Sequence, residues 1–523
     1  MRTCKASEAS AFSQAVRTLL RLRTAKKREV GWSSLLRTLL NHMFYGPRGL
    51  QTAGVILTLL GEAKICYARL GAILADGESL AEAFQWKGAA GIKACFRHYN
   101  CLMLASDLAG RAPGFVEIDC SDPHLFKECS PAALEKNVKA ICAARKKWER
   151  GELSKAALDD LEKVVGLSVT DDGLLADDRL RQDVQKAFTY DWVHCALSNG
   201  TFSVELGLLV GSGKEGLSWA SLQACFERDW RFPKARSRKG RATWKVFRYA
   251  ASSNAEKLKS TCTELLNAYS IVRHFVNVCL EHGDAAWQDR LASFNACCEV
   301  IDCLLACKRQ ATGASGQTLT NRLQAHMTAH KKAWGSDNVL PKHHWLFDVP
   351  GQVSRDGGVL LDMFITERLH LTCKGIADKF KNNDSFDPHV LRMKSWTQRS
   401  SAAERGRLST MDLLGPTEQE RFGDAAVEVA VRFNYMGMEY HTGDMFINIT
   451  TGAVGRAVSF MALHQGSAVF FVVVQTFAFV SRKARHSTVW RELGADSLSV
   501  WNVRETKLAD AWYHSGDFLV LVV

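Results

Sequence analysis

The chain has 523 residues, with 67 Lys and Arg against 55 Asp and Glu, so its formal net charge is +12. Hydrophobic residues make up 47% and charged residues 23%, which is typical of folded globular proteins and excludes a disordered or fibrous chain. The longest largely apolar run, at 468–480, is shorter than the roughly 20 residues of a membrane-spanning helix. We therefore expect no membrane partner.

The positive charge is unevenly distributed along the chain. Residues 1–48 contain ten Lys and Arg and two acidic residues in a helical pattern, whereas residues 420–523 contain nine basic and ten acidic residues. This asymmetry predicts a body that binds a polyanion and a separate C-terminal domain. The sixteen cysteines include four at helical spacing among apolar residues, which indicates reduced thiols and a nuclear or cytoplasmic protein.

Short strands and helices are predicted in the first part of the chain, at 53–57, 65–74, 78–86, 114–120 and 131–165. Asp76 lies between the second of these strands and the first helix. An aspartate in this position is either a functional carboxylate at a strand end or the cap of the helix that follows. The spacing alone favours the cap.

Helical periodicity dominates from about residue 195 to 310 and includes the strongest basic segment of the chain. Eight cations and no acid occur in this segment: Arg231, Lys234, Arg236, Arg238, Lys239, Arg241, Lys245 and Arg248. Aromatic residues, among them Trp244, are interleaved with the cations. Cations for phosphates and flat rings for bases predict nucleic-acid contact, with a solvated surface or a nuclear-localisation signal as the alternatives.

The C-terminal part of the chain is rich in β-forming residues. A polar stretch at 396–419 predicts a linker. Beyond it, six stretches separated by Gly, Asn and Asp predict a small barrel or sandwich, at 425–434, 440–449, 457–463, 467–480, 498–503 and 518–523. Such a domain either binds a partner through surface aromatic residues, as small BAH or Tudor-like barrels do, or serves as a capping or oligomerisation domain.

Three acidic residues have neighbourhoods that indicate chemistry. Asp76 follows a predicted strand, Asp191 and His194 form an Asp-x-x-His motif, and Glu367 lies in a helix predicted at 359–379. Phosphodiester transfer by two metal ions requires two or three carboxylates, because hard cations such as Mg²⁺ and Mn²⁺ prefer oxygen ligands. The spacing of these residues does not by itself establish such a site.

Further motifs accompany these residues: Lys-Gly-Ala-Ala-Gly at 87–91, Cys95 with His98, Leu-Pro-Lys-His-His-Trp at 340–345 and Glu-Arg-Leu-His at 367–370. In this order the motifs resemble the eukaryotic cut-and-paste transposases of the CACTA and Plavaka kind. The resemblance implies an α/β RNase H-like core at 49–395, interrupted by a large helical insertion at about 195–335. The basic helical segment at 1–48 would precede this core, and the linker and a small all-β barrel-like domain at 420–523 would follow it.

The resemblance also implies roles for single residues. Asp76 matches the family's second catalytic aspartate and Glu367 its terminal glutamate, the pair that would bind Mg²⁺ or Mn²⁺. Asp191 and His194 match a signature that lies near the active centre.

One departure from the family affects the expected activity. The family's first catalytic aspartate lies upstream of the position of Asp76, but residues 1–75 contain no aspartate. Because a missing metal ligand costs orders of magnitude in rate, we expect catalysis to be impaired or lost. Another acid, such as Asp119 or Asp122, would have to replace the missing ligand in an active enzyme.

A zinc site is a further expectation. The family places a Cys-x-x-Cys motif after the second aspartate, and here the corresponding segment reads Cys95-Phe-Arg-His98. Cysteine and histidine are zinc ligands, and Cys120 is the nearest further candidate. Without a second pair at zinc-binding spacing, buried thiols are the favoured interpretation.

Three functions are therefore in competition. The first is a transposase-derived, catalytically impaired DNA-binding protein, and the second is an active metal-dependent transposase or nuclease. The third is a chromatin-associated interaction module in which the C-terminal domain binds a protein. We expect DNA and a second copy of the chain as partners, and no small-molecule substrate.

Overall fold

The computed structural model describes residues 31–363 and 427–522, with gaps at 60–61, 104–112, 228–229, 234–243, 254–255, 257, 281–282, 312 and 356–359 and at 436–437, 466, 485–486, 494–496, 510 and 516–517. The chain divides into two compact units. The first comprises Met1–Trp192, Ser336–Gln352 and Leu361–Met393, and the second comprises the remaining residues.

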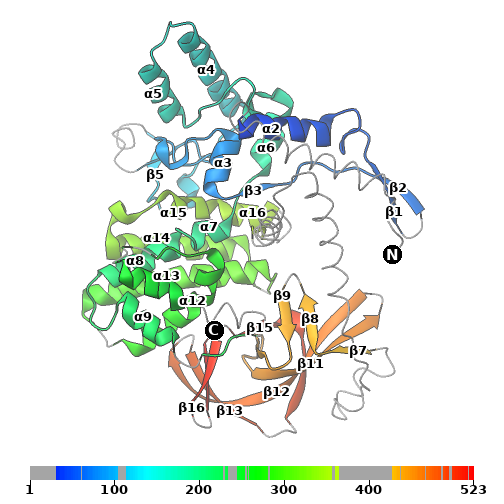
Figure 1. Ribbon diagram of the computed structural model, residues 1–523, viewed down its shortest axis with the longest axis vertical. Coiled ribbons are helices and arrows are strands. Elements are labelled where there is room, and N and C mark those ends of the chain that lie inside the picture. The colour runs from blue at the N-terminus through cyan, green and yellow to red at the C-terminus, as the bar shows by residue number, and fades with distance from the viewer. Residues whose placement is uncertain are drawn as a thin grey trace, which may run out of the picture. The chain divides into compact units, whose positions relative to one another are not determined.

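The first unit combines short helices with small sheets (Figure 1). Its helices are α2 (Trp32–Leu40), α3 (Gly77–Phe84), α4 (Pro131–Glu149), α5 (Lys155–Val165), α6 (Asp178–Ala187) and α15 (Pro341–Trp345), and α16 (Val349–Arg355) begins in it. Its strands are β1 (Val55–Leu59), β2 (Glu62–Cys66), β3 (Ile73–Ala75), β4 (Cys101–Leu102), β5 (Val116–Glu117) and β6 (Phe188–Tyr190). The pair β1–β2 is antiparallel, whereas β3–β6 and β4–β5 are parallel.

The helix predicted at 131–165 is two helices, α4 and α5, which lie side by side in Figure 1. The break has local causes. Gly151 has a φ of +76°, which non-glycine residues rarely adopt, and it follows Arg150, the residue that caps the C-terminus of α4. Ser154 then caps α5, because its hydroxyl accepts a hydrogen bond from the Ala157 N–H at 3.2 Å.

Aromatic side chains form the core around the parallel pair β3–β6. Phe188 and Tyr190 of β6 are buried, and the Phe188 ring packs on Phe84 of α3 with centroids 4.9 Å apart. The Tyr190 ring stacks on Trp345 of α15 at 5.3 Å. A two-stranded sheet of three residues per strand has little stability of its own, so this packing must hold it together.

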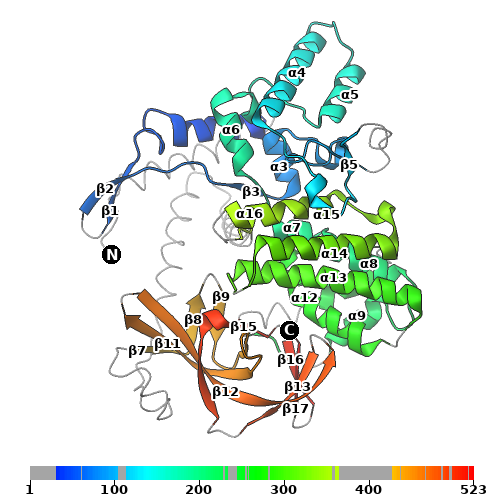
Figure 2. The ribbon, with the colours of Figure 1, turned by 180° about the vertical axis from the view of Figure 1, so that it is seen from behind.

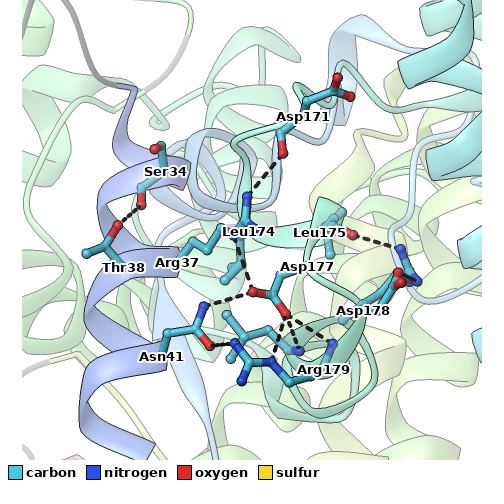
Figure 3. Close-up of polar contacts among 12 residues, drawn as sticks. Ser34, Arg37, Thr38, Asn41, Asp171, Leu174, Leu175, Asp177, Asp178 and Arg179 are labelled. Carbon is cyan, nitrogen blue, oxygen red and sulfur yellow. Dashed lines mark hydrogen bonds and ion pairs between the residues drawn. The ribbon is translucent and has the colours of Figure 1, made fainter. Parts of the chain in front are cut away.

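Asp177 fastens the N-terminal helix α2 to α6 (Figure 3). Its Oδ1 caps α6 by accepting the N–H groups of Arg179 and Leu180, at 3.0 and 3.2 Å. Its Oδ2 accepts hydrogen bonds from Asn41 Nδ2 at 2.8 Å and from Arg37 Nε at 3.3 Å. Burial by itself would raise the pKa of Asp177, but these hydrogen bonds and the charge of Arg37 lower the pKa below its ordinary value.

The second unit begins with a block of helices, as the periodicity predicted for this region. The helices are α7 (Trp192–Ala196), α8 (Thr201–Gly211), α9 (Trp219–Phe226), α11 (Trp244–Ser252), α12 (Cys262–His274), α13 (Ala285–Lys308) and α14 (Gly316–Trp334). The two longest, α13 and α14, lie side by side in both views (Figures 1 and 2). One stretch, Trp192–Gly211, has the length and composition of a membrane span, but 67% of it is buried inside the protein. Such burial is typical of a core helix.

The C-terminal residues form an antiparallel sheet (Figure 2). Its strands are β7 (Val427–Ala430), β10 (Met445–Asn448), β11 (Val454–Gln465), β12 (Ser467–Ala484), β13 (Ser487–Glu492), β14 (Leu498–Asn502), β15 (Thr506–Leu508), β16 (Ala511–Ser515) and β17 (Phe518–Val522). The strands β8 (Arg432–Tyr435) and β9 (Met438–His441) form a separate hairpin.

The order in the sheet is β15-β10-β11-β12-β13-β17-β16, with β7 on β11 and β14 on β12. Within the described residues, the end strands β15 and β16 do not pair with each other. The fold is therefore mixed α/β, with small sheets in the first unit and an antiparallel sheet at the C-terminus.

The role of Asp177 can be tested with a neighbouring residue as the control. We expect Asp177→Ala to lower the free energy of unfolding by roughly 1–3 kcal/mol, because it removes the cap of α6 and the acceptor of Asn41 Nδ2 and Arg37 Nε. Asp172→Ala, which removes an exposed carboxylate five residues earlier in the chain, should change it by less than about 0.5 kcal/mol. Denaturant unfolding monitored by circular dichroism measures both.

The contribution of Asp177 should also depend on pH. Because its pKa is lowered in the folded protein, its stabilisation is present above the ordinary aspartate pKa of about 4 and is lost as the pH falls further. The stability difference between wild type and Asp177→Asn should shrink accordingly as the pH falls below about 4. A difference that is independent of pH would contradict the assignment.

Candidate functional site

Two of the predicted carboxylates follow the ends of neighbouring strands. β3 and β6 pair in parallel, with Ala75 opposite Tyr190, so Asp76 and Asp191 are the next residue on each strand. Adjacent strands lie about 4.8 Å apart, and the carboxyl ends of parallel strands meet at the same edge of a sheet. The pairing therefore brings Asp76 and Asp191 to one edge.

Asp76 caps α3, as the spacing predicted. Its Oδ1 accepts a hydrogen bond from the Ser79 N–H at 2.7 Å. Gly77, the next residue, lies against the ring of Trp345, since a Cβ built on it would be 2.9 Å from that ring. A larger residue at 77 would push Trp345 away, so the small residue lets α15 pack beside Asp76.

Asp191 is buried, and its Oδ1 accepts a hydrogen bond from the Met363 N–H at 3.2 Å. Met363 precedes Glu367 by four residues in the sequence. Glu367 itself lies outside the described residues, but the chain that leads to it contacts the Asp191 carboxylate. His194 lies on α7 and is half-buried.

Gln352 covers the outer edge of β6. In the amide orientation that satisfies both groups, the Gln352 side-chain nitrogen donates to the Tyr190 carbonyl at 3.1 Å. The Gln352 side-chain oxygen then accepts from the Tyr190 N–H at 3.0 Å. These two bonds are those that another strand would make. The backbone next to Asp191 is therefore held on both sides, by β3 and by Gln352.

A buried group of metal-ligand side chains lies in the same unit: Cys95, His98 and His344, whose ligand atoms are within 4.8 Å of one another. Cys95 Sγ is 3.7 Å from His98 Nδ1, and His98 Nδ1 is 3.1 Å from His344 Nε2. In a tetrahedral zinc site, neighbouring sulfur and nitrogen ligands are about 3.5 Å apart. The group therefore has the donor types and nearly the spacing of a metal site.

The surroundings orient these ligands. The backbone N–H of His98 donates to Cys95 Sγ at 3.4 Å, and the ring atom His98 Nε2 faces Asp348 Oδ1 at 3.5 Å. A carboxylate on the second nitrogen of a metal-binding histidine is the usual arrangement that fixes its tautomer. Within the described residues, His344 Nδ1 is buried and has no hydrogen-bond partner.

Burial also sets the protonation of the group. Burial raises the pKa of Cys95 well above its ordinary value, and the negative charge of Asp348 raises it further. Burial and the neighbouring His98 lower the pKa of His344, so its imidazole is neutral. A neutral imidazole is the form that binds a metal, whereas the thiol must release a proton to do so.

The sequence predicted Cys95 and His98 with Cys120 as a further candidate, whereas in the structure the residue grouped with Cys95 and His98 is His344. Cys120 Sγ instead contacts the Asp122 carbonyl at 3.5 Å, and His344 completes the group. The two adjacent histidines at 343–344 were the available signal. Their distance from Cys95 along the chain left no way to choose between them.

The two acids proposed as replacements for the missing aspartate have local partners. Asp119 Oδ2 accepts a hydrogen bond from Ser336 Oγ at 2.7 Å. Asp122 caps a single 3₁₀ turn by accepting the His124 N–H at 3.0 Å. Neither interaction involves Asp76 or Asp191.

The basic segment is described only in part. Arg231, Lys245 and Arg248 are exposed, whereas residues 234–243, which include Lys234, Arg236, Arg238, Lys239 and Arg241, and the side chain of Trp244 lie outside the described residues. The neighbouring rings of Trp230, Phe232 and Phe247 are buried. These three rings belong to the core and do not form a stacking surface for bases.

Tyr440 of the C-terminal domain is likewise buried, and its ring stacks on Phe446 with centroids 5.7 Å apart. It is therefore not one of the surface aromatic residues that a partner-binding barrel would use.

Comparisons of the chain with protein-family models, with curated proteins and with solved structures give no match.

The metal group leads to a direct prediction. We expect the full chain to bind Co²⁺ with the near-ultraviolet absorption of a thiolate ligand, and Cys95→Ser to abolish that absorption. Asp348→Asn should weaken binding by roughly 10–100-fold, because it removes the carboxylate that orients His98. Cys120→Ser is the control. Loss of the absorption in Cys120→Ser, with retention in Cys95→Ser, would contradict the assignment.

Proposed function

We propose that the chain is a DNA-processing protein of the cut-and-paste transposase type, with a metal-binding carboxylate site formed by Asp76, Asp191 and Glu367 on an RNase H-like core. The observation that carries the proposal is the parallel pairing of β3 with β6, which brings Asp76 and Asp191 to one edge. The approach of Met363 to Asp191 supports Glu367 as the third member.

The donor set fits a hard divalent cation. Two carboxylates at neighbouring strand ends repel each other when both are ionised, and Mg²⁺ or Mn²⁺ relieves that repulsion through the oxygen ligands it prefers. A bound ion would supply stabilisation of the charge that develops on phosphate oxygens during phosphodiester transfer. Residues 1–75 contain no aspartate that could serve as the family's first catalytic residue. In this proposal Asp191 supplies the second aspartate of the site.

The group of Cys95, His98 and His344 packs beside the edge of β3 and β6 at which Asp76 and Asp191 lie. Cys95 Sγ is 3.7 Å from the Tyr190 hydroxyl, and Tyr190 directly precedes Asp191. His344 directly precedes Trp345, whose ring packs on Gly77 next to Asp76. We propose zinc in this group because of its sulfur and nitrogen donors. Zinc there would hold α15 and β6 in place and would take no part in the reaction.

DNA contact is proposed for the exposed cations of the second unit. Arg231, Lys245 and Arg248 flank the basic stretch 234–243, and eight cations without an acid favour a phosphate backbone as the partner. Because the rings of Trp230, Phe232 and Phe247 are buried, and Tyr249 beside Arg248 is exposed, this contact would be mainly electrostatic and would show little base preference.

A second candidate function is DNA binding without strand cleavage. The observation that favours it is the cap made by Asp76, since one of its oxygens already accepts the Ser79 N–H. The two functions make opposite predictions about metal-dependent cleavage.

We expect the full chain to nick supercoiled plasmid DNA in the presence of Mg²⁺ or Mn²⁺. Asp76→Asn and Asp191→Asn should each slow nicking by at least about a thousandfold, because metal-centred stabilisation supplies several kcal/mol and each 1.4 kcal/mol is about tenfold. Asparagine retains the helix cap at position 76, so a loss of activity reports on charge and not on folding.

Asp284→Asn is the matched control for Asp76→Asn, since it also replaces an aspartate that caps a helix with a residue that caps equally well. It should retain full activity. Nicking that persists unchanged in Asp76→Asn and Asp191→Asn would refute the carboxylate site. Metal-independent DNA binding without any nicking would favour the second candidate function.

DNA binding should depend on the exposed cations. Replacing Arg231, Lys245 and Arg248 together by Gln should weaken binding and make the slope of log K against log salt shallower by about 0.9 for each phosphate that is no longer neutralised. Replacing the exposed Lys136, Lys139 and Lys147 of α4 removes the same charge and should leave the slope unchanged. Equal effects of the two triple variants would show that only net charge matters.

A further inference from the structure

A second buried group of metal-ligand side chains lies among the helices of the second unit and consists of residues that the proposed function does not use. Glu205 belongs to α8, and His326 and His330 belong to α14. All three are buried, with Glu205 and His330 at 0% exposure, and their ligand atoms lie within 4.8 Å of one another.

Helix geometry explains why these atoms converge. His326 and His330 are four residues apart, so their side chains leave the same face of α14 one turn from each other. Both reach a single oxygen: Glu205 Oε1 is 2.9 Å from His326 Nε2 and 2.7 Å from His330 Nδ1. Two imidazoles and one carboxylate on two helices are a common donor set for zinc.

Other side chains hold the carboxylate in this orientation. Trp334, one further turn along α14, donates from Nε1 to Glu205 Oε2 at 3.0 Å. Ser293 of α13 donates from Oγ to Glu205 Oε1 at 2.6 Å. Hydrogen bonds from outer residues to a ligand carboxylate are the usual support of a metal site, because they fix which oxygen faces the ion.

The charge of the group also favours a cation. A buried carboxylate requires a positive partner or several donors, and a divalent cation would take the place of the two imidazole hydrogen bonds while Ser293 and Trp334 keep theirs.

We propose that Glu205, His326 and His330 bind a divalent transition-metal ion of the zinc class, which joins α8 to α14 inside the helical block. In a zinc site, nitrogen and oxygen ligands are about 3.3 Å apart, so the side chains would separate by roughly 0.5 Å from their present hydrogen-bonded distances. Because the group is buried, the ion is structural and has no substrate.

The test uses the full chain with Cys95→Ser and His344→Asn, so that the first metal group is absent. Metal-free protein is titrated with Zn²⁺ and Co²⁺, and bound metal is counted. We expect one equivalent of metal to bind and the melting temperature to rise when the metal is added. The X-ray absorption fine structure at the zinc edge should show nitrogen and oxygen ligands only. No metal uptake in this background would overturn the proposal and leave a metal-free hydrogen-bonded network.

Ligand variants provide the second arm. His326→Asn with His330→Asn should lose this equivalent, whereas His274→Asn, which replaces another buried histidine of the same unit, should keep it. Uptake that survives the double variant would overturn the proposal. Should the double variant fail to fold, the metal count and the melting-temperature shift in the first background still decide. A negative result for the Glu205 group would not bear on metal binding by the Cys95 group or on plasmid nicking. This proposal and the proposed function can therefore be refuted independently.

Discussion

The candidate site depends on the parallel pairing of β3 with β6. Only three residue pairs form it, yet it decides that Asp76 and Asp191 lie at the same edge. So short a pair needs support from outside, and the Trp345 ring against Tyr190 and the Gln352 amide on the β6 backbone provide it. Any change that displaces Trp345 or Gln352 would therefore move the carboxylates even though it touches neither.

Buried charges follow one rule at two carboxylates, Asp177 and Glu205: each is surrounded by donors or by an opposite charge. Asp177 accepts two backbone N–H groups and two side-chain donors, and Glu205 accepts four side-chain donors. Such saturation is required because an unpaired buried carboxylate is strongly destabilising. It also means that these side chains are held rigidly, which is what a metal site or a helix anchor needs.

Much of the local structure was predictable. The cap made by Asp76, the proximity of Cys95 to His98 and the helical character of residues 201–334 follow from short-range spacing. The break between α4 and α5 was also visible, since Gly151 and Ser154 are a helix-ending and a helix-starting residue, but the charge pattern on either side outweighed it. At 188–194, apolar and aromatic residues predicted no clear boundary, and a strand gives way to a helix after Tyr190.

The C-terminal strands were predicted less completely, because the residues of β13, β15 and β16 show only weak alternation of apolar and polar side chains. Their partners in the sheet, and not their own composition, make them strands. The basic segment shows the opposite error. Its aromatic residues matched a nucleic-acid surface in composition, but Trp230, Phe232 and Phe247 turn inward, because burying large rings is worth more than exposing them.

By itself, the sequence determined those features whose partners lie within a few residues: helix caps, the Cys-x-x-His turn, the i, i+4 pair of histidines on α14 and the distribution of charge. Tertiary structure alone decided which distant groups meet. His344 reaches His98 across 246 positions, and Glu205 reaches His330 across 125. The physical reason is that local spacing fixes the direction of a side chain relative to its own helix or strand. The packing of one element against another depends on the whole core, and no short pattern encodes it.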